Sequence, residues 1–146
     1  DAVGALISSY VQGDTPFPNF QGHHIAFDYS KIRAKSAKIT GGFKAPGPEG
    51  LRKALGLIEA LLDKATENGS KQLNAIQIYD IVMFFCDAVL SGGVRRAATI
   101  CLFSPDDEEM LRAKTGNWQQ ENLPFSFTTL AVPRRGLARD SGRQLP

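Results

Sequence analysis

The spacing of apolar residues predicts a long helix near the middle of the chain. Pro48 and Glu49 stand where residues of a first helical turn are preferred, and Gly69 stands just past the expected end. Between them, apolar side chains recur every three or four positions, as on one face of a helix: Leu51, Ala54, Leu55, Ile58, Leu61, Leu62 and Ala65.

A second helix is predicted over residues 76–90, and it is apolar nearly all round. Asp80 and Asp87 are its main polar interruptions, and Asn74 with Gln77 forms the pattern of a capping box at its start. A helix without a polar face belongs inside a larger assembly, so we expect other protein segments to cover it.

Shorter helices are predicted at two further places. Asp1 is a suitable cap for a helix that ends by Gly13, with Val3, Leu6, Ile7 and Tyr10 at helical spacing. Residues 104–108 favour another helix start, and Thr115 with Gly116 favours its end. The acidic residues of that start are explained by the helix dipole and do not indicate a metal site.

Strand patterns are few. Residues 25–29 alternate between apolar and polar positions, as a half-buried strand does, and residues 97–103 read as a buried strand. Residues 125–132 have the composition of a strand, whereas the chain from Pro133 onward is expected to be poorly ordered. The order of elements predicts an α/β chain, helix-rich with few strands. Two strands do not make a stable sheet, so further strands are needed from elsewhere.

Charge is distributed unevenly along the 146 residues. Residues 133–146 hold four of the 17 basic side chains and one of the 15 acidic ones, which leaves 13 basic and 14 acidic side chains in the remainder. The net charge of +2 argues neither for nor against a nucleic-acid partner, and none is predicted. No apolar run is long enough for a membrane span, and no signal-peptide pattern is present.

The two cysteines and two histidines suggest no metal centre. Cys86 and Cys101 are not closely spaced, which favours a reducing compartment and buried, unreactive thiols. His23 and His24 lack further ligands at a metal-binding spacing, so they are interpreted as the entry to a strand.

Residues 91–99 carry the strongest candidate for chemistry. Gly92 and Gly93 permit a turn and a close approach by a ligand, and Arg95 and Arg96 offer charged planar groups to an oxyanion or a base edge. A helix-capping glycine followed by two solvated arginines explains the same residues. A basic stretch over residues 30–44, broken by Gly41 and Gly42, is either a solvated surface or a phosphate contact.

Three stretches resemble ribonucleotide reductases, most closely the adenosylcobalamin-dependent class. They are residues 27–33 (FDYSKIR), residues 41–52 (GGFKAPGPEGLR) and residues 87–100 (DAVLSGGVRRAATI), and residues 104–107 and 114–118 continue the similarity. It covers residues 1–122. It implies a fragment of the ten-stranded α/β barrel of these enzymes, followed by a divergent tail over residues 123–146.

The resemblance also implies roles for individual residues. Residues 91–99, with Ser91, Gly92, Gly93, Arg95 and Arg96, match the family's specificity loop between an allosteric deoxynucleotide and the substrate base. Asp1 matches a residue that holds the sugar of the effector, and Arg33, Lys35 and Lys38 match the loop near its phosphates. This chain departs from the family at Ala34 and Ser36, which are usually proline and glycine, and at Ala97, which is usually serine.

The family reduces ribonucleotides through a thiyl radical made with adenosylcobalamin, and a cysteine pair supplies the electrons. Neither Cys86 nor Cys101 matches these cysteines, so no catalytic residue is expected here and no cofactor should bind to this fragment. The sequence thus predicts an inactive, cytoplasmic fragment of a reductase that contacts an effector, a ribonucleotide and a second copy of itself. A stand-alone nucleotide-binding or regulatory module, or a non-catalytic self-associating domain, remains the alternative.

Overall fold

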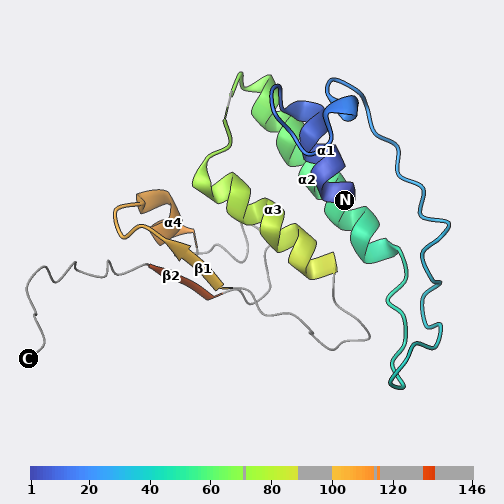
Figure 1. The fold of residues 1–146 in the computed structure, drawn as a ribbon. Coiled ribbons are helices and arrows are strands. Elements are labelled where there is room, and N and C mark those ends of the chain that lie inside the picture. Colours follow the sequence, from blue (N-terminus) through green and yellow to red (C-terminus); the bar gives the residue numbers. More distant parts are fainter. Residues whose placement is uncertain (71, 89–99, 114, 116–129, 134–146) are drawn as a thin grey trace, which may run out of the picture. The chain divides into compact units, whose positions relative to one another are not determined.

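The computed structural model describes residues 1–70, 72–88, 100–113, 115 and 130–133. The chain divides into two compact units, Asp1–Ala98 and Thr99–Pro146. Figure 1 labels the helices of the first unit and the short elements of the second. None of the helices in the described ranges is long and apolar enough to cross a membrane.

The first unit is organised around α2 (Glu49–Glu67), which contacts both α1 (Ala2–Tyr10) and α3 (Ala75–Ala88). The apolar stripe predicted for α2 forms the core: Ala54, Leu55, Ile58, Leu62 and Ala65 are all buried. Burying such side chains stabilises a fold by roughly 1.5–3 kcal/mol each for the larger ones. The hydrophobic pattern therefore identified the central helix and the face that it buries.

Both ends of α2 follow local chemistry that the sequence predicts. Glu49 lies in the first turn, where a carboxylate complements the helix dipole. At the other end, the Gly69 N–H donates to the Thr66 carbonyl and the Ser70 N–H donates to the Ala65 carbonyl. This pair of bonds is a Schellman motif, which ends helices and satisfies their last carbonyl groups.

The predicted capping box of α3 is confirmed. The Asn74 N–H donates to the Gln77 side chain, and the Gln77 N–H donates to the Asn74 side chain, both at 2.9 Å. At the opposite end, a Cβ on Gly50 of α2 would lie 3.2 Å from the Ala88 carbonyl oxygen. The start of α2 therefore packs against the end of α3, and the two helices run antiparallel (Figure 1).

One side of α3 remains uncovered, as its apolar composition predicts. Tyr79, Ile81 and Phe84 are buried, whereas Ile78, Val82 and Phe85 are exposed. These exposed residues are four and three positions apart, so they form one stripe along the helix.

The prediction of a strand over residues 25–29 is wrong. These residues adopt no regular secondary structure, although their burial does alternate: Ile25, Phe27 and Tyr29 are half-buried, and Ala26 and Asp28 are exposed. A strand exists through hydrogen bonds to a neighbouring strand, and no backbone bond of that kind is formed by this segment among the described residues. Instead, the guanidinium of Arg52 on α2 lies over the ring of Tyr29. The Cζ atom of Arg52 is 5.0 Å from the centroid of that ring.

A 3-10 helix, η1 (Pro18–Phe20), follows α1 in the proline-rich loop. Phe17 at its start lies against Gly4 of α1, where an added Cβ would come within 2.8 Å of the aromatic ring. Asp1 is the N-cap residue of α1, but its side chain makes no capping hydrogen bond, so only the position of this cap was predicted correctly.

The second unit contains β1 (Ile100–Phe103), α4 (Glu108–Arg112) and β2 (Leu130–Pro133). β1 and β2 form a parallel two-stranded sheet with Ile100 opposite Leu130. The predicted start of α4 is confirmed, because the Asp107 side chain accepts a hydrogen bond from the Met110 N–H at 3.0 Å.

The prediction that β1 is buried is wrong, because none of its four residues is fully buried. Ile100 and Leu102 are 66% and 63% exposed, while Cys101 and Phe103 are half-buried. A two-stranded sheet that is covered on one side leaves alternate side chains in solvent. β2 overlaps the segment predicted as a strand and extends to Pro133, which was expected to be poorly ordered. The rest of residues 123–146 lies outside the described residues.

Candidate functional site

Of the predicted site residues, Asp1, Arg33, Lys35 and Lys38 are described. Ser91, Gly92, Gly93, Arg95 and Arg96 lie outside the described residues, as does Ala97. Asp1 is exposed, and its carbonyl accepts from the Ala5 N–H at 2.8 Å. None of the hydrogen bonds and ion pairs of the described residues joins Asp1 to the three basic residues.

The three basic residues lie together on one short hairpin, residues 33–45, which we call the basic hairpin. The Ile39 N–H donates to the Phe43 carbonyl, and the Ala45 N–H donates to the Ala37 carbonyl. Lys38 and Lys44 form an antiparallel bridge between these two bonds. The hairpin therefore joins the basic stretch to the residues that begin α2.

Gly47 fixes the base of the basic hairpin against the start of α2. Its φ is +79°, and an added Cβ would lie 3.0 Å from the Cβ of Lys35 and 3.1 Å from its backbone nitrogen. Only glycine fits this combination of left-handed backbone and close packing. Gly47 and Ala45 are buried, whereas every side chain from 40 to 44 is exposed.

The electrostatic character of the basic hairpin is strongly positive. Residues 29–48 contain five cationic side chains (Lys31, Arg33, Lys35, Lys38 and Lys44) and no acidic one. All five are exposed, and none of the ion pairs found among the described residues involves Arg33, Lys35 or Lys38. Just before the hairpin, hydrogen bonds from the backbone and side chain of Ser30 lower the pKa of Asp28. The arrangement is chemically suited to an exposed anion such as a phosphate.

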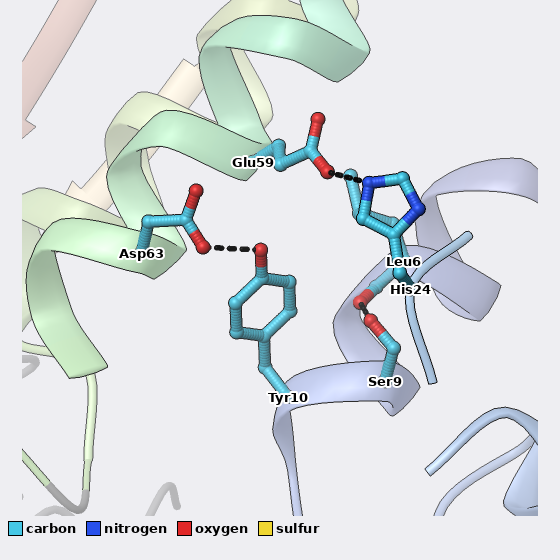
Figure 2. Close-up of polar contacts among 6 residues, drawn as sticks. All are labelled: Leu6, Ser9, Tyr10, His24, Glu59 and Asp63. Atoms are coloured by element: carbon cyan, nitrogen blue, oxygen red, sulfur yellow. Dashed lines mark hydrogen bonds and ion pairs between the residues drawn. The ribbon is translucent and has the colours of Figure 1, made fainter. Parts of the chain in front are cut away.

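A pocket of about 230 Å³ lies elsewhere in the first unit, lined by α1, α2 and residues 22–25. Figure 2 shows its polar contacts: the Tyr10 hydroxyl donates to Asp63 Oδ1 at 2.6 Å, and His24 Nε2 lies 3.6 Å from Glu59 Oε1. Burial, followed by the bond to Asp63, raises the pKa of Tyr10 above its usual range, so its hydroxyl keeps its proton. These contacts hold α1 and residues 22–25 to the same side of α2.

Sequence reasoning missed this pocket because its partners are far apart in the chain. His24 and Glu59 carry no shared motif, and His24 was interpreted as the entry to a strand. The described residues include no group of three or more histidine, cysteine or acidic side chains placed to hold a metal ion.

The two cysteines are half-buried rather than fully buried, and neither forms a disulfide. Burial raises the pKa of the Cys101 thiol, which lowers the fraction present as the reactive thiolate.

Comparison with curated proteins finds relatives over about two thirds of the chain. A Dictyostelium discoideum protein, described as a probable adenosylcobalamin-dependent ribonucleoside-triphosphate reductase, is 36% identical over 102 residues. That match covers 69% of this chain and 13% of the relative. Adenosylcobalamin-dependent ribonucleoside-triphosphate reductases of Lacticaseibacillus paracasei and Lactobacillus acidophilus are 35% and 33% identical over 94 residues, with 62% of this chain and 12% of each relative covered.

No family model and no solved structure matches the chain. The matched portion is about an eighth of the length of each curated relative.

Proposed function

Because the chain is a partial relative of the adenosylcobalamin-dependent ribonucleotide reductases, we propose that it is a segment of a reductase catalytic chain that carries part of the effector site. The observation that carries this proposal is the 36% identity over 102 residues, together with the exposed cations Arg33, Lys35 and Lys38 of the basic hairpin. In this proposal Arg33, Lys35 and Lys38 contact the phosphates of a deoxynucleotide effector.

The proposal includes Asp1 at the effector's sugar and residues 91–99 as the specificity loop, with Ser91, Gly92, Gly93, Arg95 and Arg96 between effector and substrate. The names of the relatives favour ribonucleoside triphosphates as the substrate class of the whole enzyme and adenosylcobalamin as its cofactor. The antiparallel α2–α3 pair and the parallel β1–β2 ladder are compatible with a fragment of an α/β barrel.

In this proposal the radical chemistry belongs to the parts of the reductase chain that the matched segment does not cover. Cys86 lies on α3 and Cys101 on β1, and neither stretch matches a catalytic cysteine of the family. We expect the chain by itself to form no deoxynucleotide when ribonucleoside triphosphate, adenosylcobalamin and a dithiol are supplied. Product above a control that lacks adenosylcobalamin would contradict this expectation.

The exposed stripe of Ile78, Val82 and Phe85 on α3 supports self-association of the isolated chain, because such a surface is unfavourable in water. Static light scattering at tens of micromolar, a concentration range in which exposed apolar surfaces associate, tests this part of the proposal. A monodisperse monomer would contradict it.

The effector proposal is tested by titrating the chain with deoxynucleoside triphosphates and following backbone amide resonances by NMR. We expect dissociation constants no tighter than about 100 μM, or about −5.5 kcal/mol, because most of the relatives' length is not represented here. Replacing Arg95 and Arg96 together with alanine should weaken binding about tenfold or more, since hydrogen bonds to charged groups contribute roughly 1.5–3 kcal/mol each. Unchanged binding in this double variant would exclude a role for the loop, and no response of the basic hairpin at millimolar nucleotide would exclude the hairpin.

A further inference from the structure

Asn68 and Gly69 stand at the end of α2, where the helix passes into the connection to α3. Both residues are exposed, and none of the hydrogen bonds among the described residues involves the Asn68 side chain. Asparagine is thermolabile, because its side-chain amide can be attacked by the backbone nitrogen of the residue that follows. Glycine in the following position favours this reaction, since no Cβ obstructs the approach of its nitrogen. The pair is therefore a candidate site of spontaneous covalent modification.

The reaction needs water as its only co-reactant. The Gly69 nitrogen loses its proton and forms a bond to Cγ of Asn68, while the bond from Cγ to Nδ2 breaks and ammonia leaves. The product is a cyclic imide. Water then adds to either carbonyl of this ring and opens it, which gives aspartate or isoaspartate, the form in which the backbone runs through the former side chain. No group is oxidised or reduced, so the chain can undergo this reaction without an enzyme or a cofactor.

The folded structure holds the pair in a geometry that cannot close the ring. Asn68 has a ψ of 2°, so the Gly69 nitrogen is eclipsed with the backbone nitrogen of Asn68 and lies away from its Cβ. The Gly69 N–H also donates to the Thr66 carbonyl at 2.9 Å, and the Ser70 N–H donates to the Ala65 carbonyl at 3.0 Å. Ring closure turns the Gly69 nitrogen toward the Asn68 side chain, and it therefore requires this Schellman motif to open first.

The opening is a local event at the end of α2. The last buried side chains of the helix are Leu62 and Ala65, and every residue from 66 to 70 is exposed. Segments with few buried contacts open with free energies far below that of global unfolding. The end of α2 can therefore open, and Asn68 can react, while the core of the first unit stays folded.

We propose that Asn68 is a site of spontaneous deamidation whose rate is set by the opening of the last turn of α2, and that the modification weakens this end of the helix. The product places a carboxylate at the negative end of the helix dipole, next to Glu67 and with Lys64 as the basic residue of the last turn. Isoaspartate also adds a methylene to the backbone, so the two donors of the Schellman motif no longer meet their carbonyl acceptors. This inference is independent of the effector proposal.

The test incubates the chain in mildly alkaline buffer and follows each asparagine by peptide mapping with mass spectrometry. Asn68 should convert to aspartate and isoaspartate. Asn74 is the internal control and should remain intact in the folded chain, because its side chain is held in the capping box by the Gln77 N–H. In urea, Asn68 should convert about tenfold faster, since the opened state is then always populated. Ser70→Pro removes the N–H that donates to Ala65, so it should accelerate conversion of the folded chain.

Thermal unfolding measures the consequence of the modification. Asn68→Asp reproduces the aspartate product and should lower the melting temperature by a few degrees, and aged parent chain rich in isoaspartate should melt lower still. Asn68→Gln keeps a neutral amide but closes the ring far less readily, so its melting temperature should stay constant during the same incubation. If Asn68 of the folded chain stays intact, the modification site is overturned. If it converts as fast as in urea, control by the helix end is overturned, and if converted and fresh chains melt alike, the weakening of α2 is overturned.

Discussion

The basic hairpin and α2 are neighbours in the sequence, yet they are stabilised in opposite ways. α2 contributes five buried side chains to the core, and its position follows from their burial. Residues 30–44 include no buried side chain, and their shape follows from a turn, cross-strand hydrogen bonds and the packing of Lys35 on Gly47. A segment shaped by its backbone leaves its side chains available to a ligand, which is why the basic hairpin, rather than the helices, is the candidate site.

This difference predicts where substitutions act. A change in the core of α2 should affect the whole first unit, because its helices share that core. A change at the base of the basic hairpin should disturb the hairpin and the first turn of α2 while the remaining core stays intact.

The largest effect is expected for Ile58→Ala. Ile58 is completely buried on α2, and the truncation removes apolar contacts and leaves a cavity. We expect the free energy of unfolding to fall by roughly 2–5 kcal/mol, measured by urea denaturation followed by circular dichroism. Lys53→Ala on the exposed side of the same helix should change it by no more than about 0.5 kcal/mol. Equal effects of the two substitutions would show that α2 is not the centre of the core.

The next largest effect is expected for Gly47→Ala. The added Cβ meets the backbone of Lys35, and the residue must also keep a φ of +79°, so we expect a loss of about 2 kcal/mol. Gly56→Ala is the matched control, since Gly56 lies within α2 and an added Cβ meets no atom within 4 Å. That substitution should stabilise the protein by roughly 0.5–1 kcal/mol. A stabilising Gly47→Ala would mean that the hairpin does not pack on the start of α2.

The helical part of the fold could be read from the sequence because its causes are local. The spacing of Leu55, Ile58 and Leu62 identifies a buried face, and the Asn74–Gln77 capping box consists of residues three positions apart. Strands depend on partners that the sequence does not specify. Residues 25–29 show the correct alternation, but no neighbouring strand pairs with them in the described chain, so the predicted strand did not form.

The sequence predicted which residue types the candidate site contains but not how they are arranged. The sequence showed a run of cations around Lys35 and Lys38, whereas the opposition of Lys38 and Lys44 depends on the register of the hairpin. The positive φ of Ser36 was hidden because a serine gives no signal for it. The resemblance to reductases placed Ser36 at a position usually held by glycine, and this was the one indication of this conformation in the sequence.

The smallest effect on stability is expected for a substitution of Asp80, which tests the comparison in the helical region. It lies half-buried on α3, so the helical region also contains a polar group that is held at a cost. Burial raises the pKa of this carboxyl from an ordinary value of 3.8 to about 6. Among the described residues, no hydrogen bond or ion pair offsets the desolvation of Asp80.

The direction of the pH dependence follows from proton binding in the two states. Between pH 4 and pH 6 the folded chain binds more protons at Asp80 than the unfolded chain, so the stabilising contribution present at low pH is lost as pH rises through about 6. A shift of this size in a fully buried group corresponds to nearly 3 kcal/mol, and partial solvent exposure reduces the expected cost at pH 7 to about 1 kcal/mol. Asp80→Asn keeps the shape and removes the charge, so it should stabilise the protein by about 1 kcal/mol at pH 7 and by little at pH 4. Urea denaturation of both proteins across this range provides the measurement, and parallel curves for the parent and Asp80→Asn would show that water reaches Asp80 as freely as it reaches the basic hairpin.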